Sequence, residues 1–315
     1  MNSNAEIERL ASLVEVHPDY RLLRRLQKRE RYAKSDGRKL SIGIILDTET
    51  TGLESSDKVI ELGMLRFEFD ARTGEVFGIQ ESFCSMEDPG IPISAQSSAI
   101  HGITAEMVAG KRFDDSAVEA ITRDVELVIA HNARFDRPMI EKRYPLFARL
   151  NWACSYQDIN WRATGFGGSS LEFIAYRYSF FYDAHGAEMD CRALLEILQR
   201  KQDPSGAIRP THLKQLLSTV GRVEERIWAL NAPFDKKEVL KERGYRWSND
   251  NPKCWWTSVS REDGRAERRW LLKNVYNAKG ANLRVDVIDS TARFSNRLTD
   301  SKTRYMSLDE PVIQE

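Results

Sequence analysis

One apolar run constrains the fold more than any other part of the sequence. Residues 41–47 read SIGIILD, a short apolar stretch rich in β-branched side chains that follows an Asp-Gly turn signal, and this pattern predicts a buried strand. The stretch at 59–69, VIELGMLRFEF, alternates as a second strand does, and GEVFGIQESFC at 74–84 has the pattern of its hairpin partner. Three successive strands predict the start of a sheet.

Helical patterns alternate with strand patterns further along the chain. SAVEAITRDV at 116–125 and MDCRALLEILQR at 189–200 are amphipathic, and ELVIAH at 126–131 is an apolar strand pattern between them. A further helix is expected to begin near Phe135, and Ser169 or Ser170 is a candidate N-cap for LEFIAYRY. This alternation predicts a layered α/β domain.

Composition sets the class of protein. The chain has 315 residues, 41% of them hydrophobic, which is enough for about two globular domains. It contains no run of about 18 apolar residues for a membrane span, and its first residues lack the pattern of a secretory signal. We therefore expect a cytoplasmic protein with no membrane partner. The four cysteines form no C-x-x-C pair, which argues against a zinc site or a disulfide framework.

The formal net charge of zero conceals an uneven distribution. Residues 1–40 carry a net charge of +4, residues 41–210 carry −9 and residues 211–315 carry +5. An acidic centre between basic flanks suits an enzyme that gathers carboxylates around metal ions and holds phosphates at its periphery. Solvated surface charge produces such asymmetry often, so this observation is weak by itself.

Four acids and one histidine carry the candidate chemistry. Asp47 and Glu49 stand at the end of the first apolar strand, where residues i and i+2 point to the same face. Asp136 follows another strand at the opening of a helix, and Asp190 begins a helix with His185 in the loop five residues before it. Carboxylates are the ligands that Mg²⁺ prefers. We interpret the acids as ligands of two divalent cations, Mg²⁺ or Mn²⁺.

This set fits hydrolysis of a phosphodiester bond. Two cations about 4 Å apart can activate a water and stabilise the departing oxygen. His185 can take the proton from that water, because the ordinary pKa of an imidazole, near 6.5, suits a general base. Each motif alone has a simpler explanation, since an Asp at a helix start is more often an N-cap than a ligand. Their occurrence in this order and in these structural contexts favours the catalytic interpretation.

At these positions the sequence resembles the DEDDh 3′-to-5′ exonucleases, the superfamily of the proofreading epsilon subunit of bacterial replicative polymerase. The resemblance covers about residues 41–200 and rests on D-T-E-T-T-G, H-N-A-R-F-D and H-G-A-E-M-D. It implies a ribonuclease-H-like fold with a mixed five-stranded sheet and flanking helices. It also implies the ligand and base roles given above to Asp47, Glu49, Asp136, Asp190 and His185.

The same resemblance suggests residues that contact the substrate. SSAIHGIT looks like a family loop in which His101 and Ile103 lie near the substrate end, Ile103 as a wedge between terminal bases. A loop histidine satisfied by backbone groups explains His101 equally well. Thr50 and Asn132 adjoin the first and second motifs, as does Phe135, for which core packing is an equally good account.

The chain beyond residue 205 has a different composition. Five of the seven tryptophans of the whole chain lie between residues 228 and 270 among basic residues. This segment resembles small modules that follow nuclease and helicase domains. Its pattern predicts a strand, a basic helix ending at Gly244 and a strand pair around Trp247 and Trp255. Lys237 and Arg246 are candidates for single-strand binding. The alternative is that the tryptophans form the core of a small domain.

These observations give four expected parts. Residues 1–40 are expected to be a basic extension with a helix over 20–32, either a surface helix or a nucleic-acid arm. Residues 41–204 are the expected exonuclease domain. Residues 205–299 are expected to form a small α+β domain, and residues 300–315 a flexible tail. The expected substrate is DNA, single-stranded or at a 3′ end, in repair, end trimming or proofreading. RNA is the alternative substrate, and a silent nucleic-acid-binding protein is the alternative class. No polymerase or repair partner is indicated by the sequence.

Overall fold

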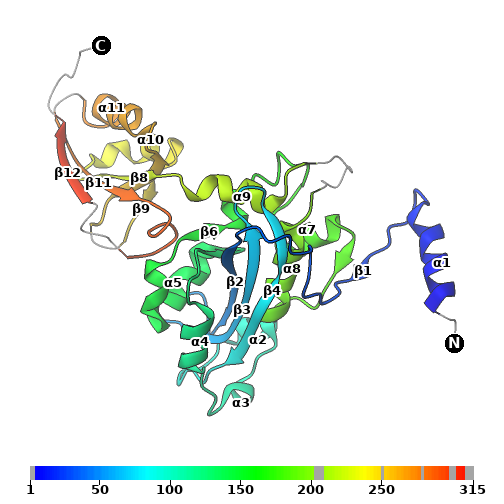
Figure 1. Ribbon diagram of the computed structural model, residues 1–315. Coiled ribbons are helices and arrows are strands. Elements are labelled where there is room, and N and C mark those ends of the chain that lie inside the picture. The colour runs from blue at the N-terminus through cyan, green and yellow to red at the C-terminus, as the bar shows by residue number, and fades with distance from the viewer. Residues whose placement is uncertain (1–3, 202–208, 250–251, 278–279, 298–302, 309–315) are drawn as a thin grey trace. The chain divides into compact units, whose positions relative to one another are not determined.

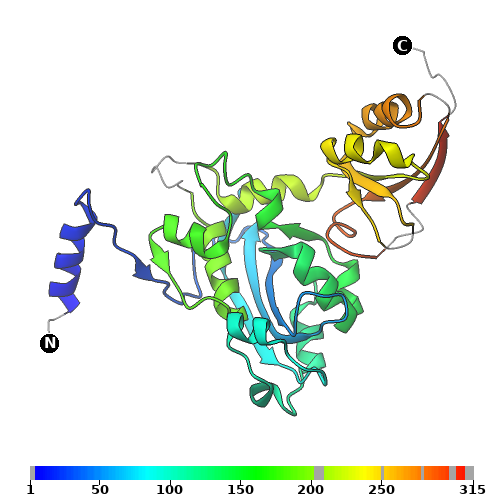
Figure 2. The same cartoon turned by 180° about the vertical axis from the view of Figure 1, so that it is seen from behind.

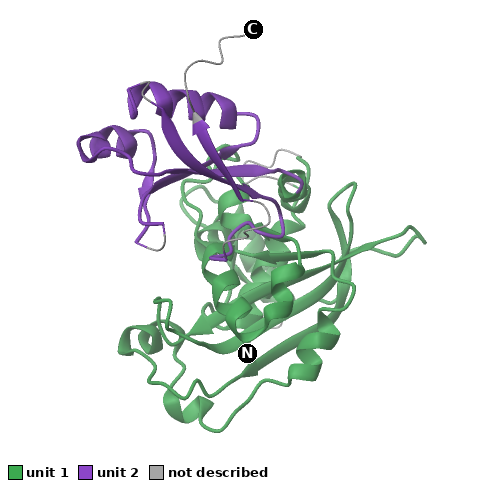
Figure 3. Ribbon diagram, turned by 90° about the vertical axis from the view of Figure 1, so that its left-hand side faces the viewer, with its two compact units in different colours: residues 1–220 green, residues 221–315 purple. Residues whose placement is uncertain are grey.

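The computed structural model describes residues 4–201, 209–249, 252–277, 280–297 and 303–308. The chain divides into two compact units, Met1–Val220 and Gly221–Glu315 (Figure 3). Each unit has its own sheet and its own hydrophobic core. The two units are therefore described separately.

Unit 1 is built on a mixed five-stranded sheet in the order β4-β3-β2-β5-β6 (Figure 1). Its strands are β2 (Ser41–Thr50), β3 (Val59–Asp70), β4 (Glu75–Met86), β5 (Leu127–Ala130) and β6 (Trp152–Cys154). The first three pair antiparallel as consecutive strands, whereas β2, β5 and β6 pair parallel. The predicted mixed five-stranded sheet is thereby confirmed.

Helices cover both faces of this sheet (Figures 1 and 2). On one face α7 (Leu171–Arg177), α8 (Ala187–Leu198) and α9 (His212–Val220) share a core with the strands. The other face carries α4 (Asp115–Ile121) and α5 (Ala133–Arg143), which occupy the connections from β4 to β5 and from β5 to β6. The predicted helices and the N-cap at Ser170, whose side chain accepts from the backbone N–H of Phe173, are confirmed.

The short elements of unit 1 complete its loops and its N-terminal segment. They are α1 (Asn4–Glu15), β1 (Arg24–Arg25), α2 (Ala95–His101), α3 (Ala105–Val108), η1 (Pro145–Arg149), α6 (Ser155–Asp158) and β7 (Phe180–Phe181). The helix predicted over residues 20–32 is wrong. That segment is extended instead, because its backbone pairs with β7, and the N-terminal helix ends before it.

Unit 2 is an antiparallel five-stranded sheet in the order β12-β11-β8-β10-β9. Its elements are β8 (Glu224–Ala229), η2 (Phe234–Lys236), α10 (Lys237–Glu242), β9 (Arg246–Trp247), β10 (Trp255–Ser260), α11 (Gly264–Asn274), β11 (Ala281–Ile288) and β12 (Thr303–Leu308). Trp255 pairs with Trp247 across β9 and β10, as predicted. Trp228 is buried, while Trp247 is 50% exposed, so the tryptophans divide between core and surface.

Two boundaries differ from the sequence-based expectation. The predicted boundary near residue 205 falls among residues 202–208, which lie outside the described residues, whereas the units divide after Val220. The reason is that α9 buries Leu213 and Leu216 in the core of unit 1. In the predicted tail, Thr303–Leu308 is the strand β12 and pairs with β11. The remaining tail residues are not among those described.

Candidate active site

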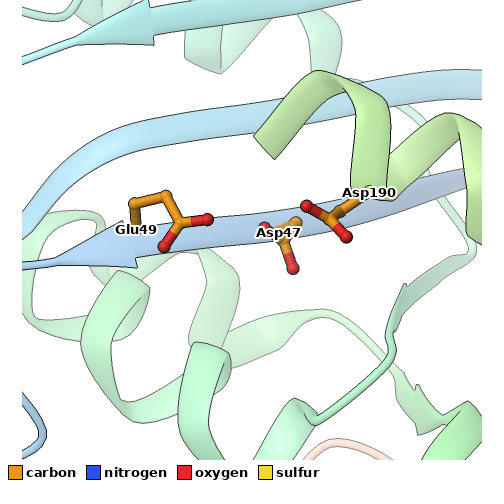
Figure 4. Close-up of side chains that lie close together, drawn as sticks. All are labelled: Asp47, Glu49 and Asp190. Carbon is orange, nitrogen blue, oxygen red and sulfur yellow. The ribbon is translucent and has the colours of Figure 1, made fainter. Parts of the chain in front are cut away.

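Alternation along β2 separates two sets of side chains. Ile45 belongs to the core that β2 shares with α8, and Asp47 and Glu49 follow it on the same face of the strand. The carboxylate oxygens of Asp47 and Glu49 lie within 4.8 Å of each other and of a carboxylate oxygen of Asp190 from α8 (Figure 4). The structure therefore brings three of the four predicted acids together.

Asp190 reaches this cluster because α8 lies unusually close to β3. A Cβ atom on Gly63 would stand 2.5 Å from the carbonyl carbon of Ala187, so only glycine admits the first turn of α8 here. The Tyr182 hydroxyl donates to Oδ1 of Asp190 at 2.9 Å. The other oxygen, Oδ2, is buried and has no hydrogen-bond partner in the described part of the chain.

Asp136, the fourth predicted acid, is held differently. It is buried in the first turns of α5, and its Oδ1 accepts from the backbone N–H of Thr48 at 3.1 Å and from the Thr48 hydroxyl at 2.9 Å. Thr48 lies between the two acids of β2 and points to the opposite face. Asp136 is outside the three-residue cluster, yet its charge raises the pKa of Asp47 more than any other neighbouring carboxylate does.

Burial raises the pKa values of all four acids, and repulsion by neighbouring carboxylates raises those of Asp47, Glu49 and Asp136 further. Burial is the largest cause for each of them. The pKa of Glu49 rises to about 8 and that of Asp136 to about 7, while those of Asp47 and Asp190 also lie above their ordinary values. Carboxylates crowded in this way gain stability from a cation.

The donor set fits divalent metal ions. Asp47, Glu49 and Asp190 offer only oxygen ligands, as hard cations require. The unpartnered Oδ2 of Asp190 is a buried acceptor that lacks compensation within the described residues, and such atoms are rare unless a ligand or ion completes them. Asp47, Glu49 and Asp190 are thus suited to hold a cation, with Asp136 adding negative charge from the α5 side.

His185 lies in the loop between β7 and α8, as the sequence predicts. Its side chain is exposed, and its backbone has a φ of 63°, a left-handed conformation that is uncommon outside glycine. Its backbone N–H and, to a smaller extent, its charge lower the pKa of Asp190, against the larger raising effect of burial. His185 is thus electrostatically linked to the acid cluster while it remains open to solvent.

The predicted substrate loop has mainly structural contacts. Nδ1 of His101 accepts from the backbone N–H of Ile103 at 3.0 Å, and Nε2 lies 3.2 Å from the carbonyl oxygen of Thr50. Backbone groups therefore satisfy both ring nitrogens. Ile103 is buried against Ile60 and Val108, so its side chain packs in a small core here, and its wedge role stays a prediction. The Thr50 hydroxyl is also occupied, because it donates to the carbonyl oxygen of Gly52 at 2.7 Å.

The residues beside the second motif divide into surface and support. Asn132 is exposed and Phe135 is half-buried at the start of α5, so both remain candidates for substrate contact. His131 lies between the Ser155 hydroxyl and the carbonyl oxygen of Ser169, each at 2.8 Å. Burial lowers the pKa of His131 to about 4. A neutral His131 therefore braces these two loops through its ring nitrogens.

Sequence reasoning missed Glu61. This residue stands opposite Glu49 in the β2–β3 ladder, is buried, and raises the pKa of both Asp47 and Glu49. Its Oε2 accepts from the backbone N–H of Ala187 at 2.9 Å. The available signal was an acid within an otherwise apolar run of strand pattern, Val59 to Leu65. Tyr182, the donor to Asp190, carried no comparable signal.

The candidate residues of unit 2 lie near exposed aromatic rings. Nζ of Lys237 stands 4.8 Å from the centre of the Phe234 ring, and Phe234 is 82% exposed. Arg246 is exposed beside Trp247 on β9. Phe234 is an addition to the residues that the sequence suggested.

Fold and site together define an exonuclease domain. Residues 44–198 match the model of the RNase_T family, described as Exonuclease. The matched segment contains all four acids and His185. The remaining residues, including the whole of unit 2, lie outside the match.

Two curated relatives match the same part of the chain. A DNA polymerase III subunit epsilon-like protein of Rhodobacter capsulatus is 34% identical over 117 residues, which cover 34% of this chain and 15% of the relative. A PolC-type DNA polymerase III of Thermotoga petrophila is 30% identical over 118 residues, covering 36% of this chain and 8% of the relative. The chain therefore spans only a small part of the length of these relatives.

Solved structures of exonucleases are also similar. Exonuclease X in complex with 5′ overhanging duplex DNA is 23% identical with a TM-score of 0.37, covering 55% of this chain and 99% of that one. E. coli Exonuclease I in complex with a 5cy-dT13 oligonucleotide is 15% identical with a TM-score of 0.45, covering 70% and 64% of the respective chains.

In the described ranges, every helix is too short or too polar to cross a bilayer.

Proposed function

We propose that this protein is a metal-dependent 3′-to-5′ exonuclease that removes nucleotides from DNA ends. The observation that carries the proposal is the cluster of Asp47, Glu49 and Asp190 within an exonuclease-family domain. In this proposal these acids, with Asp136, hold two divalent cations, Mg²⁺ or Mn²⁺. The cations would polarise the phosphodiester and neutralise charge that develops in the transition state.

The protein's own groups have separate tasks in this mechanism. His185 accepts the proton of the attacking water, because its imidazole is exposed and electrostatically linked to Asp190. Tyr182 orients Asp190 through its hydroxyl. Thr48 orients Asp136 through two donors. Asn132 and Phe135, at the opening of α5, are proposed to contact the terminal nucleotide.

DNA is the favoured substrate because the matching relatives carry polymerase names. Both are described as parts or types of DNA polymerase III, so trimming or proofreading of DNA ends is the proposed role. RNA differs from DNA by its 2′-hydroxyl, and a protein must contact that group to tell the two apart. An exoribonuclease is therefore the alternative outcome of the test.

The test uses the full-length protein and end-labelled single-stranded DNA, duplex DNA and RNA. Each substrate is incubated with Mg²⁺, Mn²⁺ or EDTA, and Asp47→Ala is compared with Glu119→Ala, which removes an exposed acid from α4. We expect wild type and Glu119→Ala to remove nucleotides stepwise from the 3′ end in a reaction that requires metal. Asp47→Ala should be inactive. Degradation in EDTA, or equal degradation by Asp47→Ala, would overturn the mechanism. Tight binding without any degradation would favour a silent binding protein.

Unit 2 is proposed to bind nucleic acid through residues on its own surface. Lys237 and Arg246 neutralise phosphates, while Phe234 and Trp247 offer exposed rings for stacking. A deletion from residue 211 is unsuitable as a test, because α9 contributes Leu213 and Leu216 to the core of unit 1. Substitutions at the surface of unit 2 are the appropriate test.

A further inference from the structure

The segment before the family-matched domain is tied to the strand that leads into the His185 loop. The backbone N–H of Arg24 donates to the carbonyl oxygen of Ser179 at 3.0 Å, and that of Leu26 donates to Phe181 at 2.8 Å. These bonds make β1 a parallel partner of β7, as the dark-blue strand beside the green segment shows (Figure 2). Three residues, 182–184, separate the end of β7 from His185.

Basic side chains of the same segment bind around this loop. Arg25 forms an ion pair with Asp183 at 2.7 Å and lies 4.8 Å from the centre of the Phe181 ring. Arg21 donates to the carbonyl oxygens of Tyr176 and Arg177, each at 2.7 Å. The arginines that suggested a nucleic-acid arm in the sequence thus have partners within unit 1.

The segment then crosses α8 and reaches the edge of the sheet. Lys28 pairs with Glu188 at 3.2 Å, and Glu30 pairs with Arg192 at 3.1 Å. The carbonyl oxygen of Glu30 accepts from Ile79 of β4 at 2.8 Å. The segment is therefore anchored on both sides of the helix that carries Asp190.

The loop between these anchors holds a strained residue. His185 has a φ of 63°, and a left-handed conformation at a non-glycine residue persists only where the surrounding structure imposes it. The strand β7 leads directly into the loop that contains His185. The partner of β7 in a two-stranded sheet is β1. An isolated two-residue strand has little stability of its own.

We propose that residues 21–32 form a strap that fixes the loop 182–186, so that Arg25 and Leu26 are positioning residues for His185; this deepens, and rests on, the function proposed above. The exonuclease segment 44–198 contains the reacting groups, whereas the strap, which precedes it, sets the geometry of one of them. The strap acts through β7, so its effect on hydrolysis depends on His185.

The direct test is amide hydrogen exchange of the full-length protein. Leu26→Pro removes the backbone N–H that donates to the carbonyl oxygen of Phe181. Leu26→Ala keeps this N–H and removes most of the side chain. Exchange of amides 180–186 should be about tenfold faster in Leu26→Pro than in Leu26→Ala, with β3 amides unchanged. Equal exchange in both variants would overturn the proposal. If Leu26→Pro does not fold, Arg25→Ala replaces it, with Arg9→Ala of α1 as the matched control.

Kinetics then ask whether the strap acts through His185. Leu26→Pro should lower kcat about tenfold with little change in KM, because the terminal nucleotide still binds while the base is misplaced. In a His185→Ala background it should have no further effect on kcat. The same loss in both backgrounds would show a general structural effect and overturn the proposal. If wild type and Asp47→Ala are equally inactive, the proposed function fails, while hydrogen exchange still decides whether the strap orders the loop.

Discussion

Glu61 of β3 accepts a hydrogen bond from the backbone N–H of Ala187, the first residue of α8, at 2.9 Å. Gly186 precedes α8 and supplies no side-chain cap, so a carboxylate from the sheet takes the place of a local N-cap. An acid at a helix N-terminus also interacts favourably with the helix dipole. This contact holds α8, and Asp190 with it, against the strand that faces Glu49.

The first prediction follows from this contact. Glu61→Ala should lower the free energy of unfolding by about 1–3 kcal/mol, because it leaves a buried N–H without an acceptor. It should also lower kcat about 10- to 100-fold through displacement of Asp190. Glu61→Gln keeps an oxygen acceptor and should retain most stability and activity. Urea unfolding and single-turnover kinetics measure both effects, and equal losses in the two variants would show that charge, not the hydrogen bond, matters.

The second prediction concerns the close approach at Gly63. Gly63→Ala places a Cβ 2.5 Å from the Ala187 carbonyl carbon, so α8 must move away from β3. We expect a loss of about 1–3 kcal/mol in the free energy of unfolding and a weaker affinity for Mg²⁺. Gly221→Ala is the control, because a Cβ there meets no atom within 4 Å. Calorimetric titration with Mg²⁺ measures the affinity, and wild-type affinity in Gly63→Ala would contradict the prediction.

The third prediction is a pH dependence of stability without metal. Burial and the neighbouring carboxylates raise the pKa of Glu49 from 4.5 to about 8, so between these values the folded state binds more protons than the unfolded state. Stability therefore falls as pH rises through this window. In EDTA, the free energy of unfolding of wild type should decline more steeply from pH 5 to pH 9 than that of Glu49→Gln. Saturating Mg²⁺ should reduce the decline, and parallel profiles in EDTA would contradict it.

The fourth prediction concerns Tyr182. Its hydroxyl donates to Asp190 and lowers the pKa of that carboxyl, opposing the larger effect of burial. Tyr182→Phe should raise the pKa of Asp190 and shift the acid limb of Mg²⁺ binding to higher pH, since a protonated carboxyl is a poor ligand. Tyr20→Phe changes an exposed tyrosine and serves as the control. An unshifted binding profile in Tyr182→Phe would show that this hydrogen bond does not tune the site.

The fifth prediction separates phosphate contact from stacking in unit 2. Lys237→Ala and Arg246→Ala should each reduce the slope of log affinity against log salt for single-stranded DNA by about 0.7. Phe234→Ala should weaken binding by about 1–3 kcal/mol with the slope unchanged. Lys273→Ala, which removes an exposed charge from α11, is the control for loss of positive charge. Fluorescence anisotropy at several salt concentrations distinguishes these outcomes, and a uniform effect of all four variants would refute a defined binding surface.

Local patterns were sufficient for most elements of the fold. The period of two along β2 predicted that Asp47 and Glu49 share a face, and their oxygen atoms do lie together with that of Asp190. The alternation of strand and helix patterns predicted the layered domain, and the resemblance supplied the mixed sheet that the structure contains. These features depend on residues close in sequence or on a recognised order of motifs.

Features that depend on distant partners were not predicted. Leu22, Leu23 and Leu26 have helical spacing, yet the extended form is stabilised by bonds to residues about 155 positions away. Glu61 was missed because its role depends on α8, whose first residue donates to it. The burial of Ile103 beside Ile60 and Val108 was likewise not expected from its loop motif. Periodicity describes one segment and carries no information about the surface on which that segment packs.

The alternation of β2 also makes activity a report on strand register. Asp47 faces Gly63 and Glu49 faces Glu61 in the native ladder. A slip by one residue would turn Leu46, Thr48 and Thr50 toward α8 and carry both acids to the opposite side. A misregistered molecule would therefore lack the cluster entirely. The specific activity of a refolded sample should then be proportional to the fraction of molecules in which β2 has its native register, even when the helix content of the sample is unchanged.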